Sequence, residues 1–314
     1  MPSTPPSSAS PARPSEPPRD GQWYPPEWPE RIRALAEGRL TPVPPRRAAT
    51  VMLLRDSGGG PSVHMLRRRA SMAFAAGAYA YPGGGVDPRD EGAVAWAGPA
   101  REEWARRLGV EEAVAQAVVC AAVRETFEES GVLLAGPDPD TVVADTTGED
   151  WEADRTALVA RELSFAEFLT RRELVLRSDL LGAWARWITP EFEARRYDTW
   201  FFVAALPKGQ RTRDVSGEAD RTVWIRPADA AAAYDRGELT MMPPTIATLR
   251  QLVPYTGAAA ALEASGERDL TPVLARASLE DDGSGGQRVV LSWPGHEEFT
   301  KHVPAARRTA GGAP

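Results

Sequence analysis

The stretch RETFEES, residues 124–130, brings three carboxylates and one guanidinium together within seven positions. On a helix with about 100° between successive residues, Glu125, Glu128 and Glu129 fall on one side, opposite an apolar side that faces a core. Carboxylates three and four residues apart repel one another unless a cation lies among them. Arg124 falls on the flank of this acidic side, so the pattern leaves much of the repulsion uncompensated.

A divalent metal ion would neutralise such a cluster. Mg²⁺ and Mn²⁺ are hard cations that favour oxygen ligands, and either would bring a bound phosphate with it. A solvated acidic helix face has the same sequence pattern. The E-x-x-E-E spacing by itself does not separate these two interpretations.

Glycines on either side of the cluster favour a site. The stretch PGGG at 82–85 follows an apolar strand pattern, and glycine lets a backbone carbonyl turn toward a ligand. Gly131 directly follows the expected helix, where helices often end on a glycine. The carboxylates therefore lie between a glycine-rich turn and a helix end.

The surrounding elements predict an α/β (α+β) fold, a mixed β-sheet with helices on its faces. Apolar and alternating runs around a Gly-rich turn predict a β-hairpin of 48–56 and 62–70. The GGG at 83–85 is expected in a loop after a strand edge, and it lacks the G-x-G-x-x-G spacing of a dinucleotide-binding fold. The other expected elements are a short helix within 23–38, a charged stretch at 93–115 leading into a helix that ends near 130, mostly helix over 151–182, strands at 184–190, 198–207 and 221–227, helices at 227–239 and 241–253, and a hairpin at 271–295.

Composition excludes several classes of protein. The chain has 314 residues, 42% of them apolar, which is enough for a substantial core. Its net charge of −7 argues against general nucleic-acid binding. The single cysteine, Cys120, allows no intramolecular disulfide, which fits a cytosolic protein. There is no run of about 18 apolar residues to span a membrane, and the start lacks the apolar segment of a signal peptide.

Shifts in composition suggest the domain boundaries. Residues 1–22 are rich in Pro, Ser and Ala and predict a disordered tail. A lead-in at 23–45 precedes the main domain at 46–304, which carries an insertion at about 91–115. Residues 305–314 predict a second disordered tail.

Together, PGGGVDPRD and RETFEESGV resemble the signature of the Nudix hydrolases. That signature runs Gly, five residues, an acidic residue, seven residues, then R-E-apolar-x-E-E-x-G-apolar. Gly84 stands at the signature glycine, Asp90 where Glu is usual, and Thr126 in a usually apolar place. The resemblance implies a Nudix-type α/β/α sandwich and metal-dependent hydrolysis of a diphosphate joined to another group.

The signature is interrupted in this chain. Thirty-three residues separate Asp90 from Arg124 instead of seven, an insertion of about 26. An interrupted signature is a feature of the peroxisomal-type coenzyme A diphosphatases, which the stretches FAAGAYAYPGG, WITPEFEARRYDTWFFVA and RGELTMMPPT also resemble. The resemblance covers about residues 45–255 and implies cleavage of coenzyme A or acyl-coenzyme A to 3′,5′-ADP and (acyl-)phosphopantetheine. A His and Gln motif of another coenzyme A-hydrolysing group is absent, because Ala75 and Ala78 occupy roughly those places.

The resemblance also implies roles for single residues. Glu128 and Glu129 would ligate Mg²⁺ or Mn²⁺, together with the Gly84 carbonyl. Glu125 would complete the metal shell or accept the proton of the attacking water. Arg124 would hold a glutamate in orientation, so that the catalytic group comprises Arg124, Glu125 and Glu129.

An acidic residue beyond the signature would complete the metal site. Glu218, just before the strand expected at 221–227, is the first candidate. Asp220 is the second and Asp198 the third. An ordinary charged turn explains any one of them equally well.

Arginines are expected to bind the substrate phosphates, because Arg suits bidentate phosphate contacts. Arg195 and Arg196 would contact the 3′-phosphate of coenzyme A, with a solvated loop pair as the alternative. Arg68 belongs to RRR at 67–69, on a strand expected to end near the site. For that residue, solvation of the sheet edge is the favoured interpretation and phosphate binding the alternative.

Other reactive side chains predict structural roles. Cys120 falls on the core-facing side of the acidic helix and is expected to be a buried small residue. His64 lies on an alternating strand and is expected to be structural rather than a base. The tryptophans are expected mostly to pack, although one could stack on an adenine ring.

Several functions share these features. Nudix hydrolases of nucleotide sugars, NADH or dinucleotide polyphosphates are alternatives, and a non-catalytic Nudix ligand sensor is another. Such a sensor should have lost signature carboxylates, which this chain keeps. We expect a small-molecule diphosphate as the partner, with no nucleic acid and no membrane, and a homodimer is allowed. A cytoplasmic location is expected, because the chain ends in GGAP rather than an S-K-L-type signal.

Overall fold

The computed structural model describes residues 27–71, 75–281, 287–294 and 296–302, the last of these by backbone alone. The tails expected at 1–22 and 305–314 lie outside the described residues. An eight-stranded sheet forms the centre, in the order β10-β2-β1-β9-β8-β11, with β3 beside β2 and β4 beside β1. Its strands are β1 (Arg46–Ser57), β2 (Gly60–Arg68), β3 (Tyr79–Ala80), β4 (Gly83–Gly85), β8 (Gly182–Ile188), β9 (Tyr197–Ala205), β10 (Ala219–Ile225) and β11 (Val273–Leu274).

The pairing of β1 makes the sheet mixed. β1 and β2 form the expected antiparallel hairpin, closed where Ser57 lies opposite Gly60. On its other side, β1 pairs in parallel with β9, from Arg46 opposite Tyr197 to Leu54 opposite Ala205. The apolar residues of β1 are buried on both faces, as a central strand requires.

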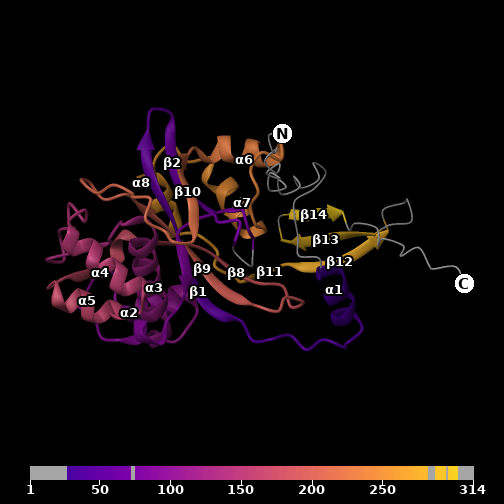
Figure 1. Ribbon diagram of the computed structural model, residues 1–314, viewed down its shortest axis with the longest axis horizontal. Helices are drawn as coiled ribbons and strands as arrows, with labels where there is room; N and C mark the ends of the chain where they lie inside the picture. Colours follow the sequence, from indigo (N-terminus) through magenta and orange to yellow (C-terminus); the bar gives the residue numbers. More distant parts are fainter. Residues whose placement is uncertain (1–26, 72–74, 282–286, 295, 303–314) are drawn as a thin grey trace, which may run out of the picture.

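Helices cover both faces of this sheet (Figure 1). One layer holds α2 (Arg101–Leu108), α3 (Glu112–Ser130), α4 (Glu149–Val159) and α5 (Phe165–Arg171), and the other holds α6 (Pro227–Asp235), α7 (Pro243–Leu252) and α8 (Ala258–Ser265). Alternate residues of β1 divide the two cores, with Val51 and Leu53 on the α3 side and Met52 and Leu54 on the α7 side. The expected α/β/α sandwich with a mixed sheet is confirmed.

A smaller unit lies at the side of the sandwich (Figure 1). It consists of α1 (Trp28–Ala36) and a sheet of β12 (Arg276–Asp281), β13 (Gln287–Trp293) and β14 (His296–His302). The late hairpin is confirmed in β12 and β13, whereas the third strand was not expected. Trp28 packs edge-to-face on Phe192, with 5.1 Å between ring centroids, and so attaches α1 to the turn between β8 and β9.

The helical prediction for 151–182 is wrong beyond Arg171, where α5 ends. The remaining residues form β7 (Val175–Arg177), the 3₁₀ turn η2 (Ser178–Leu180) and the start of β8. β7 pairs with β5 (Trp96–Ala97) and β6 (Ala135–Gly136) in a third small sheet. Partners distant in sequence therefore decide the conformation of this stretch, against its local pattern.

The inserted segment packs onto the body of the protein. After the 3₁₀ turn η1 (Pro88–Glu91), it forms β5, α2 and the beginning of α3. Trp104 of α2 packs edge-to-face on Phe202 of β9, with 5.9 Å between ring centroids. Arg107 donates to the carbonyls of Ser265 and Arg268, at 2.6 and 2.8 Å. The insertion is thus part of the α2–α5 layer.

Within the described ranges, no helix is both long enough and apolar enough to pass through a membrane.

Candidate active site

The glycine stretch and the acidic helix meet at the sheet. Gly83–Gly85 is expected in a loop but forms the short strand β4, in which Gly84 lies opposite Ala49 of β1. A Cβ atom at Gly84 would come within 2.5–2.7 Å of the carboxylate atoms of Glu125. The missing side chain at Gly84 therefore gives the Glu125 carboxylate room to reach the strand.

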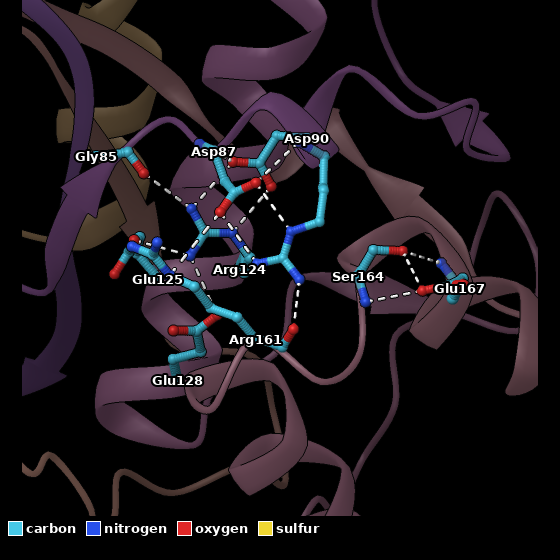
Figure 2. Close-up of polar contacts among 10 residues, drawn as sticks. Gly85, Asp87, Asp90, Arg124, Glu125, Glu128, Arg161, Ser164 and Glu167 are labelled. Carbon is cyan, nitrogen blue, oxygen red and sulfur yellow. Dashed lines mark hydrogen bonds and ion pairs between the residues drawn. The ribbon is translucent and has the colours of Figure 1, made fainter.

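Arg124 organises one half of the acidic cluster (Figure 2). Its guanidinium donates to both carboxylate oxygens of Asp90, at 2.9 and 3.0 Å. It also donates to Oε1 of Glu125 at 2.8 Å and to Oε1 of Glu128 at 3.1 Å. A further N–H donates to the Gly85 carbonyl at 3.0 Å. Arg124, expected on the flank, therefore lies at the centre of a network that joins both halves of the interrupted signature.

The burial of this half excludes a solvated acidic helix face. The side chains of Arg124, Glu125 and Glu128 are only 11%, 14% and 12% exposed. Burial raises the pKa of Glu125 to about 7, against the opposing effect of the Arg124 guanidinium. Burial raises the pKa of Glu128 as well, again opposed by Arg124. The protein thus holds these carboxylates out of water.

Glu129 forms the other half of the cluster. The backbone N–H of Gly83 donates to its Oε2 at 2.8 Å. Burial, followed by the nearby Glu125 carboxylate, raises the pKa of Glu129 well above its usual range. An ionised Glu129 is therefore unfavourable in the metal-free protein, and a bound cation would relieve that cost.

Glu218 is the downstream acidic candidate whose charge acts on Glu129. Its carboxylate is 3.7 Å from the guanidinium of Arg68. Both groups act on Glu129, whose pKa the Glu218 charge raises and the Arg68 charge lowers. The fold thus brings together Arg68, at the end of β2, and Glu218, just before β10.

The other two acidic candidates are paired elsewhere. Asp220 accepts from Nε of Arg67 at 2.6 Å. Asp198 accepts from two nitrogens of Arg186, at 2.8 and 2.6 Å. These pairings account for both carboxylates without a metal ion.

The arginine pair between β8 and β9 divides into a buried and an exposed residue. Arg196 is buried and donates to the carbonyls of Thr189 and Val43, at 3.1 and 2.8 Å. It therefore ties the turn to the segment before β1. Arg195 is exposed on the same turn, so it is the member of the pair that faces solvent.

Cys120, His64 and Thr126 have buried positions. Cys120 is buried as predicted, and burial raises the pKa of its thiol to about 12. His64 is fully buried beside the Trp224 ring, at 5.2 Å between centroids, and burial lowers its pKa to about 4. Thr126 fits the usually apolar place because its hydroxyl donates to the Ala122 carbonyl at 2.7 Å.

The donor set fits a hard divalent cation by its chemistry. In the part of the chain that is described, no three His, Cys, Asp or Glu side chains stand grouped as a ready metal site. Glu125 and Glu128 instead turn toward Arg124 (Figure 2). The oxygen donors, their burial and the unfavourable charge of Glu129 are nevertheless the features that Mg²⁺ or Mn²⁺ would satisfy.

Two contacts in this arrangement are not predicted by the sequence. The direct pairing of Asp90 with Arg124 was not foreseen, although both belong to the signature. Arg155 of α4 donates to the Glu128 carbonyl at 2.7 Å, from outside the signature altogether. Its only sequence signal is an arginine in a stretch expected to be helical, which is indistinguishable from a surface residue.

Comparison with known protein families gives a match that includes the second half of the signature. The family described as the NUDT19 Nudix domain matches residues 100–252, just under half of the chain. This range includes RETFEES and Glu218 and begins after Gly84 and Asp90.

The curated relatives share about a quarter of their residues with this chain over the matched regions. The protein named acyl-coenzyme A diphosphatase NUDT19 from Xenopus laevis is 27% identical over 146 residues, which cover 43% of this chain and 38% of that protein. A putative nudix hydrolase 7 from Caenorhabditis elegans is 26% identical over 195 residues, covering 60% of this chain and 55% of that protein. The chain thus spans between about two fifths and just over half the length of these two relatives.

One solved structure shares most of the fold. The crystal structure of a NUDIX hydrolase from Alicyclobacillus acidocaldarius superposes with a TM-score of 0.58 and 28% identity. The match covers 73% of this chain and 99% of the other. The similarity therefore extends over nearly the whole of that smaller protein.

Proposed function

Because this chain belongs to the Nudix hydrolase family, we propose that it hydrolyses the diphosphate linkage of coenzyme A or an acyl-coenzyme A. The products would be 3′,5′-ADP and (acyl-)phosphopantetheine. The reaction class rests on the buried carboxylate cluster that Arg124 organises beside Gly84. The substrate rests on similarity to proteins named acyl-coenzyme A diphosphatase from Xenopus laevis, Gallus gallus and Homo sapiens.

The acidic cluster supplies the groups that would hold Mg²⁺ or Mn²⁺. These are the carboxylates of Glu125, Glu128, Glu129 and Glu218 and the carbonyl of Gly84. Such an ion, when bound, neutralises charge on phosphate oxygens and acidifies a water molecule for attack on phosphorus.

The chain's own residues prepare this site. Arg124 holds Glu125 and Glu128 in fixed positions through direct hydrogen bonds, and the Gly83 N–H does the same for Glu129. Burial keeps bulk water away from the carboxylates, which strengthens their interaction with a cation. Glu125 would complete the ligand set or take the proton of the attacking water.

Arginines would bind the phosphates of the substrate. Arg68 pairs with Glu218 and its charge acts on Glu129, which supports a role in contacting the diphosphate. Arg195 is exposed between β8 and β9 and would contact the 3′-phosphate of coenzyme A. Arg196 would contribute by holding that turn in place.

A substrate panel tests this function. The purified protein is incubated with coenzyme A, acetyl-coenzyme A, ADP-ribose, NADH, a nucleotide sugar and diadenosine polyphosphates, with Mg²⁺ or Mn²⁺. We expect the coenzyme A compounds to be cleaved fastest, with release of 3′,5′-ADP, and EDTA to stop the reaction. Faster cleavage of another member would correct the substrate, and binding of a member without cleavage would show a ligand sensor.

A further inference from the structure

The three glutamates lie at the C-terminal end of α3, where the helix dipole disfavours negative charge. Glu125, Glu128 and Glu129 occupy its last two turns, where the helix carries partial negative charge and its carbonyls lack partners within the helix. The helix ends on Gly131, with φ 73°, whose N–H donates to the Phe127 carbonyl at 2.8 Å. The later carbonyls must therefore find donors elsewhere.

Donors from two other segments close this helix end. Nη1 of Arg155, on α4, donates to the Glu128 carbonyl at 2.7 Å. The backbone N–H of Arg213, in the loop between β9 and β10, donates to the Ser130 carbonyl at 2.8 Å. The last turn of α3 is thus fixed by parts of the chain that lie outside the signature.

Arg155 is itself held from two sides. Trp151, one turn earlier on α4, packs edge-to-face on Phe127 with 6.3 Å between ring centroids, which docks α4 against α3. Glu152 accepts from Nε of Arg155 at 3.0 Å and from Nη1 of Arg213 at 2.7 Å. Arg155 is only 7% exposed, so its guanidinium has a single well-defined place.

We propose that Arg155 is a positioning residue for the carboxylates of Glu128 and Glu129. By holding the Glu128 carbonyl, it fixes the backbone turn from which both side chains project. It also places a cation at the negative end of the helix, among groups that repel one another. This inference rests on the proposed function, since it concerns the cation that these carboxylates would hold.

The variant Arg155→Met removes the charge and the donors and keeps most of the side-chain volume. We expect Mn²⁺ binding, measured by titration calorimetry without substrate, to weaken roughly 10-fold, as for other residues that orient metal ligands. The kcat for coenzyme A should fall, with little change in KM. Hydrogen exchange of the amides at 128–131 in the metal-free protein should become faster. Arg155→Lys keeps the charge and one donor and should recover part of each loss.

Arg177→Met is the matched control. Arg177 is 8% exposed, donates to the Thr141 carbonyl at 2.9 Å and pairs with Asp179 through Nε and Nη2. Its surroundings therefore resemble those of Arg155, but it lies on β7, away from the end of α3. We expect this variant to lower the free energy of unfolding and to leave Mn²⁺ affinity and exchange at 128–131 unchanged.

If Arg155→Met does not fold, Glu152→Ala makes the same test. The Glu152 side chain is 39% exposed, and alanine removes the oxygens that accept from Arg155. Wild-type Mn²⁺ affinity and wild-type exchange in these variants would overturn the positioning role. If the wild-type protein binds Mn²⁺ but cleaves no panel member, the proposed function fails, and weaker Mn²⁺ binding by the variants still supports the positioning role. A wild-type protein that binds no Mn²⁺ would overturn both.

Discussion

The two halves of the acidic cluster balance their charge differently. Around Arg124, one guanidinium donates to three carboxylates, those of Asp90, Glu125 and Glu128, so each of them has a cationic partner within the protein although the negative charges outnumber the positive one. This half is organised before any ligand arrives. It is a rigid support, in which each side chain restrains the others.

Around Glu129 the balance is incomplete. The carboxylate receives a backbone N–H from Gly83, while the charges of Glu125 and Glu218 act against its ionisation. The comparison suggests a division of labour, in which the Arg124 half holds the site in shape and the Glu129 half provides the attraction for a cation. Variants that disturb one half at a time can separate these roles.

Arg124→Met breaks the first half and has the largest expected effect. It leaves Asp90, whose side chain is 1% exposed, buried without its counterion. Removing one partner of a buried ion pair costs about 3–5 kcal/mol. We expect the free energy of unfolding, measured by urea denaturation at pH 7, to fall by that amount.

Arg89→Met is the control for that measurement. Arg89 pairs with Asp87 nearby, but its side chain is 38% exposed. Exposed pairs contribute less than about 1 kcal/mol, so this variant should stay close to the wild type. Equal losses in the two variants would contradict the central place given to Arg124.

Glu129→Gln breaks the second half and leaves the first intact. Turnover should fall by more than about 100-fold, beyond the loss typical of residues that only orient ligands, because an amide supplies no negative charge. In the presence of EDTA the same variant should have a higher Tm, because a carboxylate with a raised pKa destabilises the fold at neutral pH. Initial rates and thermal denaturation measure the two effects, and near wild-type turnover would defeat the ligand assignment.

Glu125→Gln tests the Arg124 half through the pH dependence of the free energy of unfolding. Its expected effect is the smallest of the three site variants. Burial raises the pKa of Glu125 from its ordinary 4.5 to about 7. The protonated carboxyl therefore contributes stability that is fully present below pH 4.5 and is lost as the pH rises through about 7. In the metal-free protein, the variant should gain stability over the wild type between pH 5 and pH 8, by on the order of 2–3 kcal/mol. Urea denaturation at both pH values checks this, and a constant difference would refute it.

The local sequence pattern correctly predicted the strands and helices that are marked by regular apolar spacing or by residues typical of helix starts. The apolar and alternating runs gave the β1–β2 hairpin, and prolines at the first helical positions marked α6 and α7. β7 was predicted wrongly, because Leu176 is buried by pairing with Trp96 and Ala135, which are far away in sequence. Helix α8 was not predicted, since its Ala-rich sequence carries no strong periodic signal.

The candidate site was predictable to the extent that its residues lie on one helix. Spacing alone placed the three glutamates of α3 together and identified Gly131 as the helix end. The central position of Arg124 depends on Asp90, and the closing of the helix depends on Arg155, which are contacts across folded segments. A helical projection carries no information about either.

The ion pair between Asp90 and Arg124 spans 34 positions of the chain, four times the separation of an uninterrupted signature. The entropy of closing a loop grows only with the logarithm of its length, by about 0.6 kcal/mol for each doubling. The longer connection therefore adds only about 1.2 kcal/mol to the cost of bringing the two residues together. This cost is smaller than the free energy lost when the buried ion pair is broken. A whole helix can therefore be inserted between the two halves of the signature while Asp90 and Arg124 remain paired.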